Sequence, residues 1–142
     1  MKSRILTLVL GAALLAPVSA LAGVVVIANP SVKTESLTAD QVAKLYMGRT
    51  TSLPDGTAVQ PLDLPAGVPA RTDFLGKVLD KTEQQLRSYW SRAIFTGKAQ
   101  PPRQMGNAAE VVRAVASNPG YVGYVDSKDV GAAKVKVLFS AE

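Results

Sequence analysis

Runs of strand-forming residues alternate with capped helical segments along this chain, and that alternation restricts the fold more than any other feature. A continuous, mostly β-branched run over residues 23–28 predicts a strand buried on both faces. Further strands are predicted over residues 57–62, 121–125 and 135–139, with helices between them. This order favours an α/β architecture, in which a central, mostly parallel sheet is flanked by helices.

Capping signals indicate where three of the helices begin. Thr38 and Thr82 are each followed three residues later by glutamine, which is the capping-box pattern, and another helix is predicted to begin after Asn107. The helix after Thr82 has the clearest amphipathic spacing, and we expect Tyr89 and Trp90 to be core anchors on it. Its inward positions are expected to be Leu86, Tyr89, Trp90, Ala93 and Ile94.

Residues 59–79 form the stretch where a ligand is most easily bound, because they predict a strand, a loop and a helix in succession. Pro69 suits the first helical turn, since its ring fixes φ and its missing N–H would have no helical partner. In α/β proteins the carboxyl end of a strand and the positive end of a helix meet at such a loop, which favours anions. Arg71 is able to pair with an oxyanion through two hydrogen bonds, although an arginine on an exposed first helical turn is more often merely solvated. The expected ligand-binding residues of this loop are Gly67, Ala70, Arg71 and Thr72.

Four other polar residues lie near the predicted loop or at the end of the first strand. Asn29 and Ser31 follow that strand, so we expect their polar groups to face the same crevice as the loop, although turn formation alone would explain them. Asp63 and Asp73 flank the loop, which makes them a candidate acid/base pair. An aspartate at a helix start is also stabilised by the helix dipole, and we expect Asp73 to support the helix.

The composition excludes several kinds of chemistry. The chain has no cysteine and no histidine, which removes disulfides, thiolate nucleophiles, histidine general bases and the usual zinc sites. No convincing carboxylate pair remains to build a mechanism. We therefore predict a protein that is not an enzyme, with no catalytic residue, no metal site and no cofactor.

The first 22 residues have the pattern of a secretory signal peptide. Lys2 and Arg4 precede an apolar run over residues 5–18, and Ala20 and Ala22 form a small-residue cleavage pattern before Gly23. The expected mature chain, residues 23–142, suits one domain, and no later segment approaches the ~20 apolar residues of a membrane span. It carries 14 basic and 11 acidic residues without a basic cluster, so we expect no nucleic-acid partner.

Six short stretches of the chain, taken together in their order and spacing, match those of a known family. The stretches are Val25-Val26-Ile27-Ala28-Asn29-Pro30, Leu37-Thr38-Ala39-Asp40-Gln41-Val42, Leu45-Tyr46-Met47-Gly48-Arg49, the loop with Phe74, Tyr89-Trp90 and Asn118-Pro119-Gly120-Tyr121-Val122-Gly123-Tyr124-Val125. They resemble one lobe of a type 2 periplasmic binding protein, namely the phosphate-binding subunit of phosphate ABC transporters and in particular its short single-lobe members, over most of residues 23–142. The resemblance implies an exported substrate-binding protein that takes a small oxyanion such as phosphate and works with an inner-membrane transporter or sensor.

The sequence departs from that family at the anion-binding motif. Full-length phosphate binders have Ser-Gly-Thr at the start of this helix and an arginine just upstream, whereas this chain has Val68, Pro69 and Ala70 with no upstream arginine. Two functions therefore stay open. The first is a periplasmic module that binds a small anion, and the second is an interaction domain without a ligand, which docks on a membrane protein, another periplasmic partner or a second lobe.

Overall fold

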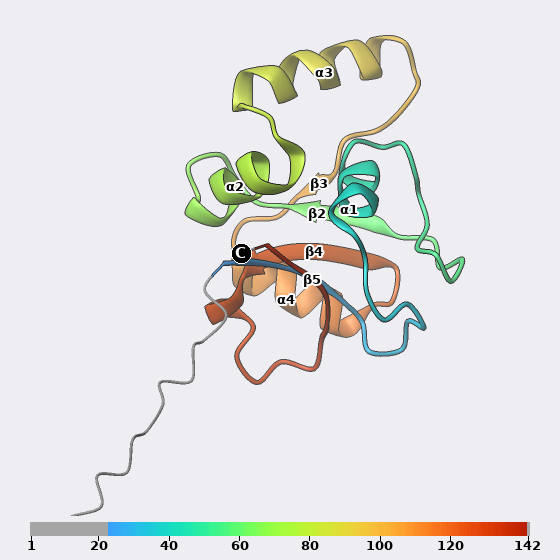
Figure 1. Ribbon diagram of the computed structural model, residues 1–142, viewed down its shortest axis with the longest axis vertical. Helices are drawn as coiled ribbons and strands as arrows, with labels where there is room; N and C mark the ends of the chain where they lie inside the picture. Colours follow the sequence, from blue (N-terminus) through green and yellow to red (C-terminus); the bar gives the residue numbers. More distant parts are fainter. Residues whose placement is uncertain (1–22, 142) are drawn as a thin grey trace, which may run out of the picture.

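The β-branched run after Gly23 forms strand β1 (Val24–Ala28), and all five of its residues are buried. In the computed structural model, which describes residues 23–141, β1 lies inside a five-stranded sheet of order β3-β2-β4-β1-β5 (Figure 1). It pairs antiparallel with β4 (Tyr121–Asp126) on one side and with β5 (Lys136–Ala141) on the other. The predicted burial on both faces is confirmed.

The rest of the sheet is formed by β2 (Gln60–Asp63) and the two-residue strand β3 (Arg103–Gln104). β2 pairs parallel with both β3 and β4. Since β4 and β5 both run antiparallel to β1, the other four described strands share one direction and β1 opposes them. The predicted α/β architecture is confirmed, with a mixed sheet in which β1 separates two strands of the majority direction.

Strand β2 covers residues 60–63 and not the predicted residues 57–62. β2 begins at Gln60 rather than Thr57, because the residues before it form a bridged turn in which Ser52 pairs with Ala58. Pro61 is tolerated inside the sheet because β3 pairs only with Leu62 and Asp63, which leaves β2 locally unpaired on that side at the proline. No sequence signal predicted β3, which follows two prolines.

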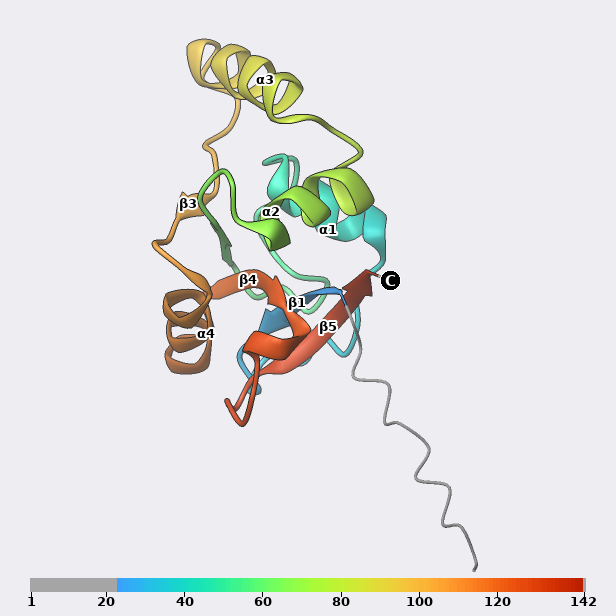
Figure 2. The same cartoon turned by 90° about the vertical axis from the view of Figure 1, so that its left-hand side faces the viewer.

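Helices cover both faces of the sheet. α4 (Ala108–Ser117) packs against β4 and β1 on one face, while α1 (Ala39–Tyr46) and α2 (Pro69–Phe74) lie over the other face (Figures 1 and 2). The contact between α4 and β4 is close at Gly123, where a Cβ atom would lie 2.4 Å from Cγ1 of Val111. Glycine in β4 thus allows the helix to approach the strand.

The predicted helix starts are confirmed. Thr38 and Thr82 form complete capping boxes, and the side chain of Asn107 accepts the backbone N–H of Glu110. Pro69 is the first residue of α2, as expected, but that helix continues into the π-helix η1 (Leu75–Leu79). Its predicted apolar stripe still faces inward, because Phe74 and the three apolar residues of η1 are buried.

The helix α3 (Glu83–Phe95) stands apart from the sheet on the side of α1 and α2 (Figure 1). Trp90 is buried, as predicted, whereas Tyr89 is half-buried and donates its hydroxyl hydrogen to the carbonyl oxygen of Met47 at 2.7 Å. The expectation that Ile94 faces inward is wrong, because its side chain is 56% exposed. Because α3 projects beyond the sheet, the rest of the fold covers only a narrow stripe of its side chains, namely Leu86, Trp90 and Ala93. Ile94 lies outside that stripe.

Between Gly23 and Ala141 no helix combines the length and apolarity needed to cross a membrane. The predicted signal peptide and its cleavage after Ala22 lie outside the described residues.

Candidate functional site

The predicted loop connects the end of β2 to the start of α2 and is a tight turn. The N–H of Val68 donates to the carbonyl of Pro65 at 3.3 Å, and Gly67 occupies the left-handed region at φ 91°. The carbonyl of Val68 accepts the N–H groups of both Arg71 and Thr72, at 3.0 and 3.2 Å. Since Pro69 has no N–H and those of Arg71 and Thr72 are already bonded, the first turn of α2 offers an incoming anion little beyond the N–H of Ala70.

Arg71 points back across the loop and is held by two carboxylates. Its Nε and one terminal nitrogen donate to the two carboxylate oxygens of Glu83, at 2.7 and 3.0 Å. Its other terminal nitrogen donates to Asp63 at 2.7 Å and to the carbonyl oxygen of Leu64 at 3.0 Å. The Arg71 side chain is only 11% exposed, so the expected exposed first-turn arginine is instead part of a largely buried ion-pair network.

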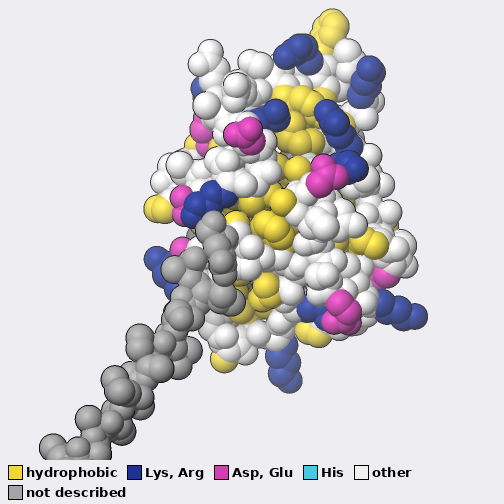
Figure 3. All heavy atoms as spheres, viewed as in Figure 1, with side chains coloured by type: hydrophobic (Ala, Val, Ile, Leu, Met, Phe, Trp, Pro, Cys, Tyr) yellow, Lys and Arg dark blue, Asp and Glu magenta, His cyan; other side chains and the backbone are white. Residues whose placement is uncertain are grey.

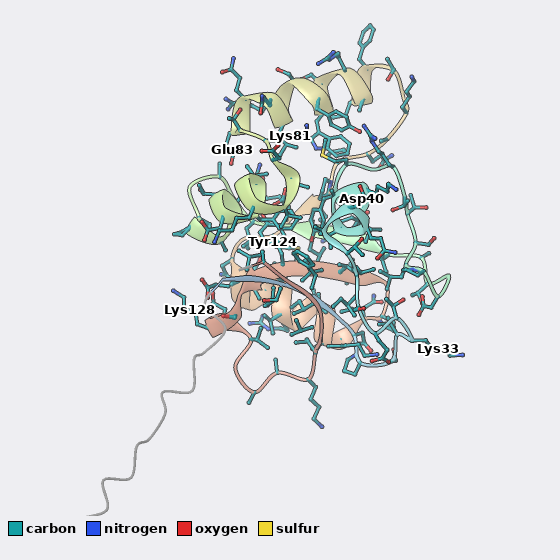
Figure 4. The ribbon with its side chains drawn as sticks, viewed as in Figure 1. Lys33, Asp40, Lys81, Glu83, Tyr124 and Lys128 are labelled. Atoms are coloured by element: carbon teal, nitrogen blue, oxygen red, sulfur yellow. The ribbon has the colours of Figure 1, made fainter. Side chains whose placement is uncertain are left out.

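Asp63, the last residue of β2, is the centre of this network. The Tyr124 hydroxyl donates a short hydrogen bond to its Oδ1 atom, which also accepts the backbone N–H of Leu64 at 2.8 Å. Tyr124 stacks on Phe74 of α2 with ring centroids 3.9 Å apart, and its place between the sheet and the helices is visible in Figure 4. Strand β4, strand β2 and helix α2 thus meet at Asp63.

The pKa shifts in this network favour the charged forms of Arg71 and Glu83. Hydrogen bonds from Arg71 lower the pKa of Glu83, and the same contact raises the pKa of Arg71. Burial raises the pKa of Tyr124 well above its usual value, with the Asp63 carboxylate raising it further, so this hydroxyl stays a hydrogen donor. Two carboxylates against one guanidinium leave the network with a net charge of −1.

This arrangement holds the loop in place but is poorly suited to take up a free oxyanion. Four of the five guanidinium hydrogens of Arg71 are directed to protein acceptors, and a second negative charge would have to approach Asp63 and Glu83. The helix-start hydroxyls of the phosphate-binding motif are also missing. In this structure Arg71 links Asp63 at the end of β2, the backbone of the loop and Glu83 in α3.

The structure does not bring all the expected site residues together. Asn29 and Ser31 do not face the loop, because Ala28 is level with Val122 and Pro61, so these residues lie beyond the start of β2 while the loop follows its end. The expected shared crevice was wrong because β1 runs opposite to β2. The Asn29 side chain instead donates to the carbonyls of Val115 and Ala116 in α4, at 3.1 and 3.0 Å, and accepts from Ser31.

The remaining expected residues lie at the loop in different environments. Ala70 is buried, whereas Gly67, Thr72 and Asp73 are exposed. Glu83 had no sequence signal as a partner of Arg71, and Tyr124 had none as a partner of Asp63, since the members of these pairs lie 12 and 61 positions apart. Over residues 23–141 no group of histidine, cysteine, aspartate or glutamate side chains is suited to hold a metal ion.

Comparison with known proteins gives a fold but no sequence relative. Neither a protein-family model nor a curated protein matches the sequence. Among solved structures, an ABC-type phosphate transport receptor from Vibrio cholerae matches with a TM-score of 0.63 and 16% identity, over 83% of this chain and 46% of the receptor. PstS from Borrelia burgdorferi matches with a TM-score of 0.61 and 14% identity, over 82% of this chain and 46% of PstS.

A third solved structure is a putative phosphate ABC transporter substrate-binding protein with bound phosphate from Clostridium perfringens. It matches with a TM-score of 0.60 and 16% identity, over 82% of this chain and 44% of that protein. The chain thus spans less than half the length of each of these receptors. From Gly23 to Ala141 this chain has the fold of one lobe of a periplasmic binding protein, of the kind found in phosphate transport receptors.

Proposed function

We propose that this chain is an exported, single-lobe binding-protein module that docks on a partner protein in a transport or sensing assembly, rather than a receptor that captures free phosphate. The observation that carries the proposal is the engagement of Arg71 by Asp63 and Glu83. The best anion-binding side chain of the loop is already neutralised inside the fold. We therefore expect a partner protein to recognise the surface of this lobe and not an anion bound by it.

The extent of the fold shared with the matched receptors supports the same proposal. Ligand sites bury most of a small ligand's surface, and a single lobe leaves an ion half in water, where an ion pair contributes ~0 to 1 kcal/mol. The matched receptors have more than twice the length that this chain covers. In the proposed assembly, a partner protein would face this lobe in place of the remaining part of those receptors.

The cellular setting of the proposal is the periplasm. The signal-peptide pattern of residues 1–22 and the fold of periplasmic receptors both support export. The proposed partner is an inner-membrane transporter or sensor, or a second lobe on another chain. We propose no enzymatic activity and no nucleic-acid partner.

Cross-linking in whole cells of the source organism, followed by mass spectrometry, tests the docking proposal. The expected result is one dominant cross-linked partner that recurs in independent trials and is absent when the signal sequence is deleted. An unrelated exported protein of similar size and charge is the control for contacts due to crowding. Repeated trials without a recurrent partner would contradict the proposal.

A second candidate function is binding of phosphate or a related oxyanion, favoured by the fold that this chain shares with a phosphate-bound protein. Titration calorimetry of the mature protein with phosphate and sulfate separates the two functions. We expect no binding heat at millimolar concentrations. Binding heat in the wild type that is lost in an Arg71→Ala variant, shown by circular dichroism to be folded, would favour the anion receptor instead.

Restoring the missing motif provides a sharper form of that experiment. A Val68→Ser/Pro69→Gly/Ala70→Thr variant returns two hydroxyls and one N–H to the start of α2. We expect the restored motif to gain at most weak affinity, because Asp63 and Glu83 still hold Arg71. Adding Glu83→Gln removes one of these charges, so a gain in phosphate affinity only in the combined variant would identify the Arg71 network as the barrier.

A further inference from the structure

A groove runs between α3 and the turn that follows α1. It has a volume of about 660 Å³ and lies outside the loop network described above. Its floor is closely packed, because a Cβ atom on Gly48 would lie 2.7 Å from Cβ of Ala99 and 3.1 Å from the Trp90 ring. Its size falls in the range of clefts that hold a small molecule or several residues of a peptide. We call it the α3 groove.

Three cations line the α3 groove. Arg92 and Lys98 come from the last turn of α3 and the residues after it, and Arg49 comes from the turn after α1. No carboxylate is among the lining residues, and the ion pairs found over residues 23–141 engage other cations, namely Lys44, Arg71 and Lys136. The carboxyl end of a helix attracts cations, which explains part of this cluster, but Arg49 lies on a different element. The groove is therefore a local excess of positive charge.

Apolar groups accompany these charges. Inside the groove, Tyr89 and Ala93 provide an apolar wall, and at the end of α3 the side chains of Ile94 and Phe95 are 56% and 92% exposed. Figure 3 shows hydrophobic side chains at this end of the molecule bordered by Lys and Arg side chains. An exposed phenylalanine beside a basic groove is the composition expected of a protein-binding surface, where aromatic and arginine side chains are enriched.

The geometry points to the α3 groove as the docking site for an acidic segment of a partner protein that also carries an apolar side chain. This inference rests on the proposed function and names the surface that carries it out. Charge complementarity favours carboxylates opposite Arg49, Arg92 and Lys98, while an apolar side chain of the segment would cover Phe95. A single inorganic anion would leave the apolar wall in water, and a flat lipid surface would not fill a concave groove.

Site-specific photo-cross-linking in cells of the source organism tests this inference. A benzophenone amino acid replaces Phe95 in the full chain, and in separate control variants it replaces Lys33 or Lys128, which lie far from α3 in Figure 4. We expect one protein adduct from position 95 and none from the controls. Mass spectrometry of that adduct should place the cross-link in a segment rich in aspartate and glutamate.

The cross-linked segment, made as a fluorescent peptide, then gives the affinity. We expect an Arg49→Glu/Arg92→Glu variant to bind it at least about tenfold more weakly, and the wild-type affinity to fall as salt is raised. The matched control is Lys33→Glu/Lys128→Glu, which changes the net charge equally and should stay within about twofold of wild type. Circular dichroism confirms that both variants are folded.

The possible outcomes distinguish two cases: docking at a surface other than the α3 groove, and no docking at all. An adduct from position 33 or 128 but none from position 95 would overturn the α3 groove and leave the proposed function standing. Adducts from none of the three positions, with no partner in general cross-linking, would overturn both. An adduct segment without acidic residues, equal loss of affinity in both charge variants, or binding only to phosphatidylglycerol vesicles or to inorganic phosphate would each overturn the stated partner chemistry.

Discussion

Arg71 and Glu83 face each other in a two-fold hydrogen-bonded pair, with N–O distances of 2.7 and 3.0 Å. The pair joins the first turn of α2 to the first turn of α3, and Figure 4 shows Glu83 where α3 approaches α2. α3 lies outside the sheet layers, so this ion pair is one of the contacts that set its orientation. It also removes Arg71 from the set of groups able to meet a ligand.

Replacing Arg71 by alanine should destabilise the fold by about 2 to 3 kcal/mol, because it leaves Asp63 and Glu83 without their cation in a partly buried site. Urea unfolding followed by circular dichroism measures the change. The matched control is Lys44→Ala, which breaks the exposed pair with Asp40 and should cost less than about 0.5 kcal/mol. Equal effects of the two changes would show that the Arg71 network does not hold the loop.

Acid should weaken the fold through two carboxylates whose pKa is lowered in the folded state. Backbone N–H donors, that of Thr57 first, lower the pKa of Asp55 to about 2, and Arg71 lowers that of Glu83 from its ordinary 4.5. The folded state then binds fewer protons than the unfolded chain, so this stability is present above pH 4.5 and is lost as the pH falls toward 2. Urea midpoints between pH 7 and 3 should decline, and less steeply in Glu83→Gln. An equally steep decline of the urea midpoint in the wild type and in Glu83→Gln would show that Glu83 does not contribute to the loss of stability in acid.

A methyl group at Gly123 should cost about 1 to 3 kcal/mol, because it would lie 2.4 Å from Cγ1 of Val111 and force α4 away from β4. Thermal unfolding of Gly123→Ala measures this. Gly76→Ala is the control, since nothing lies within 4 Å of a Cβ there and η1 should gain up to ~1 kcal/mol from reduced backbone freedom. An unchanged midpoint in Gly123→Ala would contradict the close packing of α4.

Trp90→Ala should cost about 3 to 5 kcal/mol, since the ring is 8% exposed between α3 and the rest of the fold. The control on the same helix is Phe95→Ala, which should stay within about 0.5 kcal/mol because that side chain is 92% exposed. Denaturant unfolding of the two variants makes the comparison. A large loss in Phe95→Ala would place that ring in a contact within the folded chain and weaken its role in docking.

Features set by neighbouring residues could be predicted from the sequence. The capping boxes at Thr38 and Thr82 and the proline that begins α2 each depend on a few adjacent positions, and all three are confirmed. Burial of β1 and of Trp90 followed from local patterns of apolar residues. The two-residue strand β3 had no such pattern, because it exists only through its pairing with β2.

The candidate site was harder to predict because its geometry depends on distant pairings. The local pattern identified Arg71 at a helix start, but its neutralisation depends on Glu83 in the next helix and on Asp63 in β2. The position of Asn29 depended on the direction of β1 relative to β2, which hydrophobic alternation does not reveal. The hydrogen bonds from the Asn29 side chain to α4 depend on how α4 packs against β1, which a local sequence pattern does not reveal.

The pairing of β1 has a consequence for how the chain folds. Val24 is level with Asp126 in β4 and with Ala141 in β5, so the first strand finds its partners only after about a hundred further residues have been synthesised. Contacts between such distant parts of a sequence close slowly, and the hydrophobic centre of the sheet forms only when they do. An incomplete chain that ends before Tyr121 therefore lacks both neighbours of its most buried strand. Such delayed closure would keep a nascent chain unfolded until β4 and β5 have been made, as the proposed export requires.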